Sequence, residues 1–556
     1  MGDVSQPLAP TEDRSVDRLS ELLGRHVQFV YTAWDRIVLT GYIDQLQRPE
    51  NLVRYFRDAF GITSLTPEVL MSRTGPYRAW VTRFCRDQQI PLLPAPKGVR
   101  KEEFVGPHYR RLGGSEGVAC VLSGLEQGRT FVSYTPRYLP STQDPNWRLV
   151  RACRKRFLHF YFYVFDPVLG PMSLRVATFL PFTIACYLNG HSFLAQELSR
   201  QGVQFRKEDN AFLDVDDLDA LQAASERLTP HLIQQRCAYW ARQLAPRFSP
   251  ADCAGLNLGY RFSVTQIELA TDILFSRSAQ LKALFQRAAE IGVLLGGADR
   301  TSHIFGRRIT HRYRGRLETV LDRRNEGYPT LRTYYQTSFV KQYEKGNRLL
   351  RTETCLNDTH HVAIGRHLEN LPALKERLAA TNARYLEAQA ELLASTVDAG
   401  DLVALSQPTL VGHRRIPGIK LHDDRVIRLL EVLLHPGNFV ANWTSREVHA
   451  RLLARHRLTD PDYRLGQLRY DMAKLRAKGL VERLGRTRRY RVTPFGLKLG
   501  VLLVKLRLRL LGPLGSLLAD PLRSPVRHPN PVEAAFRQVN AALDNLCNAL
   551  GLTTAA

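Results

Sequence analysis

The chain has few cysteines, and no two of them lie close together. There are eight in 556 residues, with no Cys-x-x-Cys pair and no short cysteine–histidine spacing. A zinc finger needs four such ligands at close spacing, so none is visible here. The scattered cysteines are instead expected to be reduced and buried in the fold.

Long hydrophobic runs are also missing. The run from Val176 to Leu188 is too short to cross a bilayer, and the later run from Leu499 to Leu511 is interrupted by Lys505. The first residues, MGDVSQPLAPTEDRS, are polar and do not resemble a signal peptide. We therefore expect a cytoplasmic protein with no membrane partner.

The common catalytic motifs are absent, and acidic residues are outnumbered. There is no GxxxxGK phosphate loop, no HExxH pair and no Ser-His-Asp signature. Lys and Arg number 78 against 53 Asp and Glu, which gives a net charge of +25. So large an excess points to a polyanionic partner, most often nucleic acid, without specifying DNA or structured RNA.

The length predicts three or four domains, at roughly 150 residues each. The expected fold class is α+β, with antiparallel sheets and helices followed by a winged helix. The chain divides into a disordered start (1–20), an N-terminal α/β region (21–150), an α+β domain (151–300), a β-rich segment with the candidate active site (301–365), a helical linker (366–405), a winged-helix domain (419–498) and a Pro-rich, helical tail (499–556).

The strongest strand signal begins at Arg156. In RFLHFYFYVFD, apolar residues fill both faces, as in a central strand covered on both sides. MSLRVATF and TIACYLNG predict two more strands, and HSFLAQELSRQG a helix. GVACVLSGLEQGRTFVSYTP predicts a hairpin that turns at Glu126–Gly128, and Gln266–Phe275 has helical periodicity.

A basic module lies near the C-terminus. Leu465, Leu468, Met472 and Leu475 recur at helical spacing, and Gly479 ends that helix. Two short strands then follow at 480–481 and 490–492, which completes the outline of a winged helix, a nucleic-acid-binding or protein-binding module. The cations expected to contact nucleic acid are Arg464, Arg469, Lys474, Arg476, Arg486, Arg488, Arg489 and Arg491.

The segment KQYEKGNRLLRTETCLN contains Lys341-x-Tyr343-x-Lys345 and Arg351-x-Glu353. This spacing is similar to a pattern in the rolling-circle replication initiators of plasmids and filamentous phages, although an arginine is usual at the first position. The resemblance implies Tyr343 as the nucleophile, Glu353 as a ligand of Mg²⁺ or Mn²⁺, and Lys341, Lys345 and Arg351 around the phosphate. A phenol needs such cations to ionise.

Several other residues are weaker candidates. Glu268 and Asp272, four residues apart on the expected helix, share a face and could add carboxylates to the metal site. His159 lies on a strand where many nicking enzymes carry two metal-binding histidines, but the second position here is Tyr161, so core packing is the favoured role. Asp217 fits an N-cap better than a ligand. Tyr334, beside further tyrosines, could stack on bases.

The chain also resembles a large bacterial family that is often present in several copies per genome. The shared stretches include FYFYVFDPVLGPMSLRVATFLPF, YLNGHSFLAQEL, ELATDILF and YEKGNRLLRTETCLN. Multiple copies suit a mobile or replicating element. The expected function is nucleic-acid binding in such an element, with metal-dependent nicking of DNA by Tyr343 as its enzymatic form. The alternatives are a non-catalytic ribonucleoprotein component and a winged-helix transcriptional regulator.

Overall fold

The computed structural model describes residues 27–72, 74–96, 101–135, 148–248, 258–279, 318–322, 330–394, 405–412, 414–420, 423–435 and 442–507, with isolated positions besides. They form two compact units. Unit 1 comprises Met1–Leu393 with His435–Trp443, and unit 2 comprises Ala394–Leu434 with Thr444–Ala556. The predicted disordered start and most of the predicted tail lie outside the described residues.

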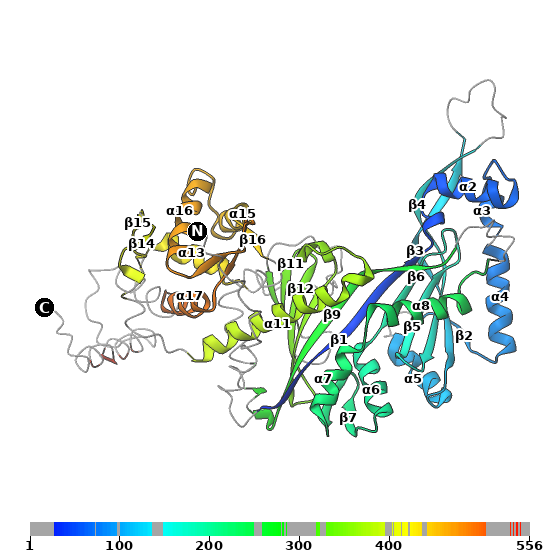
Figure 1. Cartoon of the computed structure of the whole chain (residues 1–556), viewed down its shortest axis with the longest axis horizontal. Helices are drawn as coiled ribbons and strands as arrows, with labels where there is room; N and C mark the ends of the chain where they lie inside the picture. The colour runs from blue at the N-terminus through cyan, green and yellow to red at the C-terminus, as the bar shows by residue number, and fades with distance from the viewer. Residues whose placement is uncertain are drawn as a thin grey trace, which may run out of the picture. The chain divides into compact units, whose positions relative to one another are not determined.

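An eleven-stranded sheet forms the centre of unit 1 (Figure 1). Neighbouring strands pair antiparallel wherever their pairing is described, except for one parallel pair, β2 with β3. In sheet order the strands are β10 (Glu318–Asp322), β11 (Thr330–Tyr335), β12 (Ser338–Lys345), β13 (Leu349–Leu356), β9 (Arg261–Phe275), β1 (Val27–Tyr42), β6 (Ile184–Leu188), β5 (Gly170–Ala177), β4 (Leu149–Asp166), β3 (Gly117–Tyr134) and β2 (Leu92–Pro94).

The sheet joins segments that lie far apart in the sequence. Strand β1 pairs with β9 on one side and with β6 on the other. Strand β9 in turn pairs with β13. The predicted segments 21–150, 151–300 and 301–365 therefore all contribute strands to one sheet, and the chain is α+β.

Helices cover this sheet and bury its apolar side chains. A large core surrounds Trp34, Phe162 and Phe193, and a second one surrounds Tyr55 and Phe56. The helices of unit 1 are α2 (Pro49–Phe60), α3 (Pro67–Met71), α4 (Thr74–Asp87), α5 (Lys101–Leu112), α6 (Gly190–Arg200), α7 (Leu218–Glu226), α8 (Pro230–Leu244) and α11 (Leu371–Ala394), and a separate hairpin is formed by β7 (Phe205–Glu208) and β8 (Ala211–Val215).

The strand predictions around residue 160 are confirmed. Strands β4, β5 and β6 follow one another and lead into α6, and β4 is buried on both faces from His159 to Val164. The turn between β4 and β5 begins at Asp166, whose carboxylate accepts hydrogen bonds from the amides of Val168 and Leu169 at 2.8 Å. Gly170 then adopts a φ of 74°, in the region that favours glycine.

The predicted hairpin at Glu126–Gly128 is wrong. Strand β3 runs straight through these residues and pairs with β4 from Gly117 to Tyr134. Gly128 serves close packing here, because a Cβ at this position would lie 2.6 Å from the ring of Phe157. The polar residues that suggested a turn lie on a partly exposed length of strand instead.

The predicted helix at Gln266–Phe275 is also wrong, since these residues belong to β9. All nine residues from Ile267 to Phe275 are buried on a strand covered on both faces, so apolar residues do not alternate with polar ones. Such a run matches helical spacing by chance. Within the predicted helical linker at 366–405, the structure has the helix α11 (Leu371–Ala394).

Unit 2 contains helices α13 (Asp424–Leu433), α15 (Ser445–His456), α16 (Leu465–Ala477) and α17 (Pro494–Leu506). A three-stranded sheet has the order β16 (Trp443–Thr444), β18 (Arg489–Val492), β17 (Val481–Arg483), and a small hairpin is formed by β14 (Thr409–Val411) and β15 (Arg414–Ile416). The predicted amphipathic helix and both predicted short strands are present. None of the described helices, in either unit, has the length and apolarity needed to span a bilayer.

Candidate functional site

Strands β12, β13 and β9 bring most of the predicted site residues to one face of the sheet. The register places Lys341 opposite Glu353, and Tyr343 opposite Arg351. It also places Arg351 opposite Asp272. Because alternate residues of a strand share a face, these five side chains come together. We call this group, with the residues that contact it, the charge cluster.

Arg351 lies at the centre of the charge cluster and is fully buried. Its Nε and Nη2 donate to the two carboxylate oxygens of Asp272 at 2.7 and 2.6 Å, a bidentate pair. Burial opposes the charged form of both groups, but their mutual attraction outweighs it. The pKa of Arg351 is therefore raised well above its usual value, and the pKa of Asp272 is held below its usual range.

Two residues of the charge cluster come from distant parts of the sequence. Asp35 sits at a register shift of β1, directly after Trp34, and its Oδ1 lies 3.3 Å from Nη1 of Arg351. His191 stands in the first turn of α6. That helix approaches β1 closely because Gly190 precedes His191, and a Cβ on the glycine would lie 2.3 Å from the carbonyl oxygen of Trp34. Asn189 caps α6 and donates to the carbonyl oxygen of Asp35 at 2.8 Å.

Both ring nitrogens of His191 face the charge cluster. Its Nε2 lies 3.2 Å from Nη2 of Arg351 and 3.6 Å from Oδ2 of Asp272. Its Nδ1 lies 3.5 Å from Oδ1 of Asp35. Burial and the nearby Arg351 both lower the pKa of His191, so the imidazole is neutral.

Tyr343 and Lys341 both contact Glu353. The hydroxyl of Tyr343 donates to Oε1 of Glu353 at 3.0 Å, and the ammonium of Lys341 forms an ion pair with Oε2. Burial opposes the charge on Lys341, but the carboxylates of Glu353 and Glu268 outweigh it and raise its pKa well above the usual value. Burial raises the pKa of Glu353 to about 7, against the attraction of Lys341.

The charge cluster contains more carboxylates than buried cations. Four carboxylates, those of Asp35, Asp272, Glu268 and Glu353, face two buried cations, Lys341 and Arg351. Arg36 lies 3.7 Å from Glu268, but its side chain is 51% exposed. Even with Arg36 counted, these described residues leave one negative charge over (four against three). Because the pKa of Glu353 is about 7, a proton on its carboxylate near neutral pH removes this excess negative charge.

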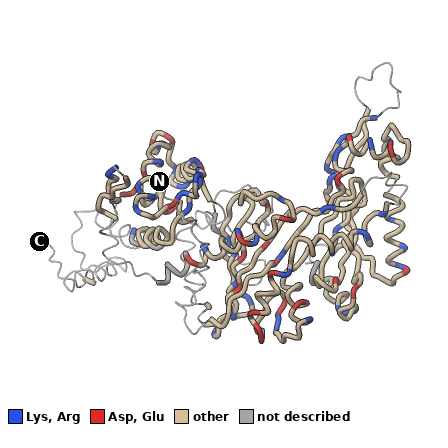
Figure 2. The backbone as a smooth tube through the Cα atoms, in the orientation of Figure 1, with Lys and Arg blue, Asp and Glu red and all other residues tan. Residues whose placement is uncertain are grey.

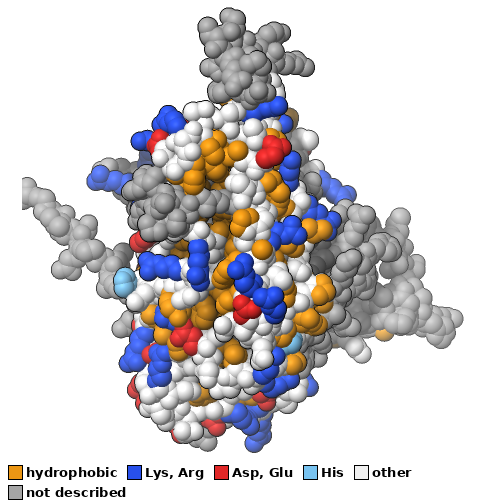
Figure 3. Space-filling model, turned by 90° about the vertical axis from the view of Figure 1, so that its right-hand side faces the viewer, with side chains coloured by type: hydrophobic (Ala, Val, Ile, Leu, Met, Phe, Trp, Pro, Cys, Tyr) orange, Lys and Arg blue, Asp and Glu red, His pale blue; other side chains and the backbone are white. Residues whose placement is uncertain are grey.

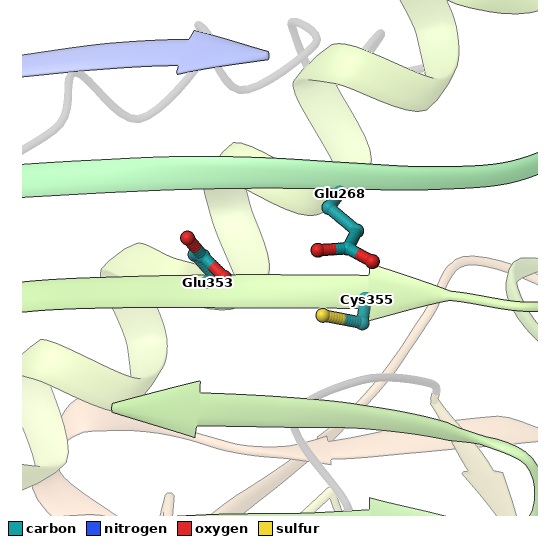
Figure 4. A group of neighbouring side chains, drawn as sticks. All are labelled: Glu268, Glu353 and Cys355. Carbon is teal, nitrogen blue, oxygen red and sulfur yellow. The ribbon is translucent and has the colours of Figure 1, made fainter. Parts of the chain in front are cut away.

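Glu268, Glu353 and Cys355 could hold a metal ion, since their ligand atoms lie within 4.8 Å of one another (Figure 4). The fit to Mg²⁺ or Mn²⁺ is poor, because these ions prefer oxygen ligands and the third donor is sulfur. Burial also raises the pKa of the Cys355 thiol well above its usual value. Lys341 contacts both carboxylates and already supplies a positive charge. Asp272, predicted as a ligand, is held by Arg351 instead.

The remaining predicted catalytic residue, Lys345, lies apart from the centre. Its ammonium donates to Asp209 at 2.8 Å and to the side-chain oxygen of Asn210, both in the turn between β7 and β8. The backbone carbonyl of Asn210 in turn accepts from Arg351 at 2.6 Å. Lys345 thus ties that turn to the edge of the charge cluster.

The opposite face of the same strands carries uncharged polar residues. Gln342 donates to Thr352 at 2.9 Å and to Gln389 of α11 at 2.8 Å. Thr354 donates to Asn382 of α11 at 2.6 Å. These buried hydrogen bonds fix α11 on the sheet and hold the register that assembles the charge cluster.

Three further sequence candidates have structural roles. His159 stacks on Phe157 with ring centroids 4.6 Å apart, and burial lowers its pKa. Asp217 caps α7 by accepting from the amide of Ala220 at 2.8 Å, as predicted. Tyr334 is 5% exposed and packs beside Phe339, so its ring is not available for stacking on bases.

Unit 2 presents exposed cations on α16 and on the turn between β17 and β18 (Figure 2). The exposed members are Arg464, Arg469, Arg476, Arg486 and Arg488. Lys474 is partly buried and lies over the ring of Tyr470, with Nζ 4.8 Å from its centroid. Arg491 is paired with Glu482.

Asp471, the other acidic residue of this segment, is directed inward. Its carboxylate accepts from Arg425 at 3.0 Å and from the Tyr463 hydroxyl at 2.7 Å. Burial raises the pKa of Asp471 despite these partners. Both acidic residues of the segment are thus engaged within unit 2, and neither is available to neutralise the exposed arginines.

Comparison of the chain with protein-family models, with curated proteins and with solved structures found no match.

Proposed function

We propose that this protein binds nucleic acid through unit 2, as part of a mobile or replicating element. The order of elements α13, β16, α15, α16, β17, β18 corresponds to that of a winged helix. In that arrangement α16 is the recognition helix and the turn between β17 and β18 is the wing. DNA and structured RNA are both compatible with this surface.

One observation carries the proposal, namely the exposed arginines of α16 and the wing, which face solvent while the acidic residues beside them are used internally. Arg469 and Arg488 are exposed on the two elements that a winged helix directs at its target. Asp471 and Glu482 are engaged by Arg425 and Arg491. The surface therefore has a net positive charge that matches a phosphate backbone.

The test is the salt dependence of binding. Changing Arg486 and Arg488 to Ala removes two phosphate contacts, so affinity falls for every sequence and the slope of log K against log salt becomes shallower by about one unit per arginine. Arg491→Ala is the matched control, because this arginine is already paired with Glu482. An unchanged slope in the double variant would exclude the wing from the interface.

A second candidate function is nicking of DNA by Tyr343. Its specific support is the hydrogen bond from the Tyr343 hydroxyl to Glu353, whose pKa lies near 7. Glu353 can accept the phenol proton as the Tyr343 oxygen attacks phosphorus. It can return this proton to the leaving sugar oxygen as the bond between that oxygen and phosphorus breaks. Because Tyr343 is 6% exposed, the charge cluster must open before a phosphodiester can reach it.

A further inference from the structure

Beyond the sheet of unit 1, strands β3 and β4 continue as a two-stranded ribbon. Their pairing runs on to Tyr134 and Leu149. Strand β5 pairs with β4 only from His159 onward, and β2 pairs with β3 only at residues 121–123. Among the described strands, residues 125–134 and 149–158 therefore pair only with each other. We call these residues, with Arg148, the ribbon.

The ribbon is strongly basic. It contains six cations (Arg129, Arg148, Arg151, Arg154, Lys155 and Arg156) and one acidic residue, Glu126, a net charge of +5. Glu126 accepts from the Tyr161 hydroxyl and lies 3.5 Å from Arg175, so it is engaged within the sheet. Arg154 and Lys155 are exposed.

Aromatic and apolar groups are interspersed with these cations. The cross-strand register puts Val132 opposite Arg151, and the guanidinium of Arg151 lies 5.6 Å from the ring centroid of Tyr134, which is 38% exposed. Figure 3 shows the molecule from the side where Figure 1 has α2, α3 and α4. On that face Lys and Arg side chains lie among exposed hydrophobic ones, with fewer acidic side chains.

A pocket of about 250 Å³ opens between the ribbon and α3. Its apolar wall includes Leu70 and Met71 of α3, Val132 of β3, and the rings of Phe157 and Phe179. These two rings are in contact, with centroids 4.8 Å apart. The pocket can therefore hold a mostly apolar group.

The same pocket has polar and cationic groups. Thr130 and Ser133 line it, and the Ser133 hydroxyl is buried with no hydrogen-bond partner among the residues that the structure describes. Lys155 and Arg156 also line it. A group seated there would meet aromatic rings, a hydroxyl in need of a partner, and cations suited to an adjoining phosphate.

We infer that the ribbon binds single-stranded nucleic acid and that this pocket receives one of its bases. An aliphatic ligand would satisfy the apolar wall, but it would bring no negative charge to Lys155 and Arg156. A nucleotide satisfies both, because its base stacks on aromatic rings and its phosphate pairs with Lys or Arg. Only an unstacked base can enter, which favours a single strand over a duplex. This inference rests on the proposed function and extends it to a second surface, on unit 1.

The test uses the full chain and single-stranded oligonucleotides of DNA and RNA that carry a photoreactive thio-base. We expect crosslinks in the peptides that contain Met71, Val132 and Lys155. Reversing two charges, Arg154→Glu with Lys155→Glu, should weaken binding about tenfold or more. Arg83→Glu, an exposed charge reversal on α4 outside the ribbon, should have a smaller effect.

Val132→Phe tests the contribution of the pocket apart from that of the charges, because it fills the pocket and leaves every cation in place. This variant should weaken binding without changing the slope of log K against log salt. With an oligonucleotide that carries an abasic position, wild type and variant should bind with the same affinity. The inference is overturned if the ribbon peptides are not crosslinked. It is also overturned if Val132→Phe binds the oligonucleotide normally and only blocks binding of an alkyl sulfate probe.

The same experiment distinguishes this inference from the function proposed for unit 2. In the Arg486→Ala, Arg488→Ala chain, the ribbon crosslinks should persist at raised protein concentration. If that chain keeps the ribbon crosslinks and its slope of log K against log salt is unchanged, the binding role of unit 2 is rejected and that of the ribbon is kept. If that chain loses affinity and wild type shows no ribbon crosslinks, the binding role of the ribbon is rejected and that of unit 2 is kept.

Discussion

The guanidinium of Arg351 and the carboxylate of Asp272 form a bidentate pair to which solvent has no access. Both residues lie on central strands of the sheet, one on β13 and the other on β9. Removing the charge of one partner leaves the other buried and unpaired, which is far more costly than loss of a surface ion pair.

Arg351→Met should therefore destabilise unit 1 by about 3–5 kcal/mol, because Asp272 and Asp35 lose their shared cation. The measurement is chemical unfolding followed by tryptophan fluorescence. Arg83→Met, which removes an exposed arginine, should change stability by no more than about 0.5 kcal/mol. Combining Arg351→Met with Asp272→Leu should recover part of the loss, and an equal loss in both variants would contradict the pairing argument.

Glu353 should make unit 1 less stable as the pH rises. Its pKa is raised to about 7 in the folded protein, above the ordinary value of 4.5, so the folded state holds its proton more tightly. The stability from this proton is fully present below about pH 4.5 and is lost as the pH rises through 7. Histidines with lowered pKa, such as His191, act in the opposite direction over part of this range.

The readout is therefore the difference between wild type and Glu353→Gln. Gln cannot titrate, so the variant should lack the downward contribution between pH 4.5 and 7. Asp272 does not interfere, because its pKa is held below the ordinary value and its contribution is lost only under more acidic conditions. Parallel stability curves for the two proteins would show that Glu353 does not titrate in this range.

Lys341→Ala should make the thermal stability of the protein depend on added metal ion. Without the ammonium, Glu268 and Glu353 are left as buried carboxylates beside Cys355. Addition of Zn²⁺, which accepts both sulfur and carboxylate ligands, should then raise Tm, with a gain of about 2.7 kcal/mol at a metal concentration one hundred times Kd. Lys345→Ala serves as the control, and equal metal responses in the two variants would argue against this site.

Arg469→Ala tests whether α16 reads sequence. Arg469 is exposed in the middle of that helix. A bidentate contact to a base would make the variant lose preference at one or two positions, at a cost of roughly 1–3 kcal/mol there. Binding to a randomised oligonucleotide pool, sequenced before and after selection, measures this. A uniform loss over all sequences would assign Arg469 to the backbone.

Nicking by Tyr343 predicts a covalent product. Incubation of the protein with labelled single-stranded or supercoiled DNA and Mg²⁺ or Mn²⁺ should leave label on denatured protein, since a phosphotyrosyl ester survives denaturation. Tyr343→Phe should abolish the adduct and keep binding, because only the hydroxyl is lost. Normal cleavage by the Phe variant, or no adduct with wild type under any of these conditions, would remove this function.

Much of the local structure follows from the sequence. Turn residues such as Asp166 and Gly170 mark strand ends, and Thr or Asn before a helix marks its start, because these residues act within a few positions of the backbone that they shape. The spacing of Lys341, Tyr343, Arg351 and Glu353 on two adjacent strands likewise predicts a shared face. Strand alternation and a short hairpin are sufficient for that.

Only the tertiary structure decides the rest of the charge cluster. Asp35 and His191 lie far from Arg351 in sequence, and no local pattern selects them, because the pairing of β1 with β9 and the approach of α6 at Gly190 bring them there. Burial is equally non-local. Tyr343 and Arg351 look like a reactive pair in the sequence. Once the sheet forms, both are buried and paired with carboxylates of the charge cluster. Periodicity could not reveal that β9 is a strand, since a strand covered on both faces loses the alternation that identifies one.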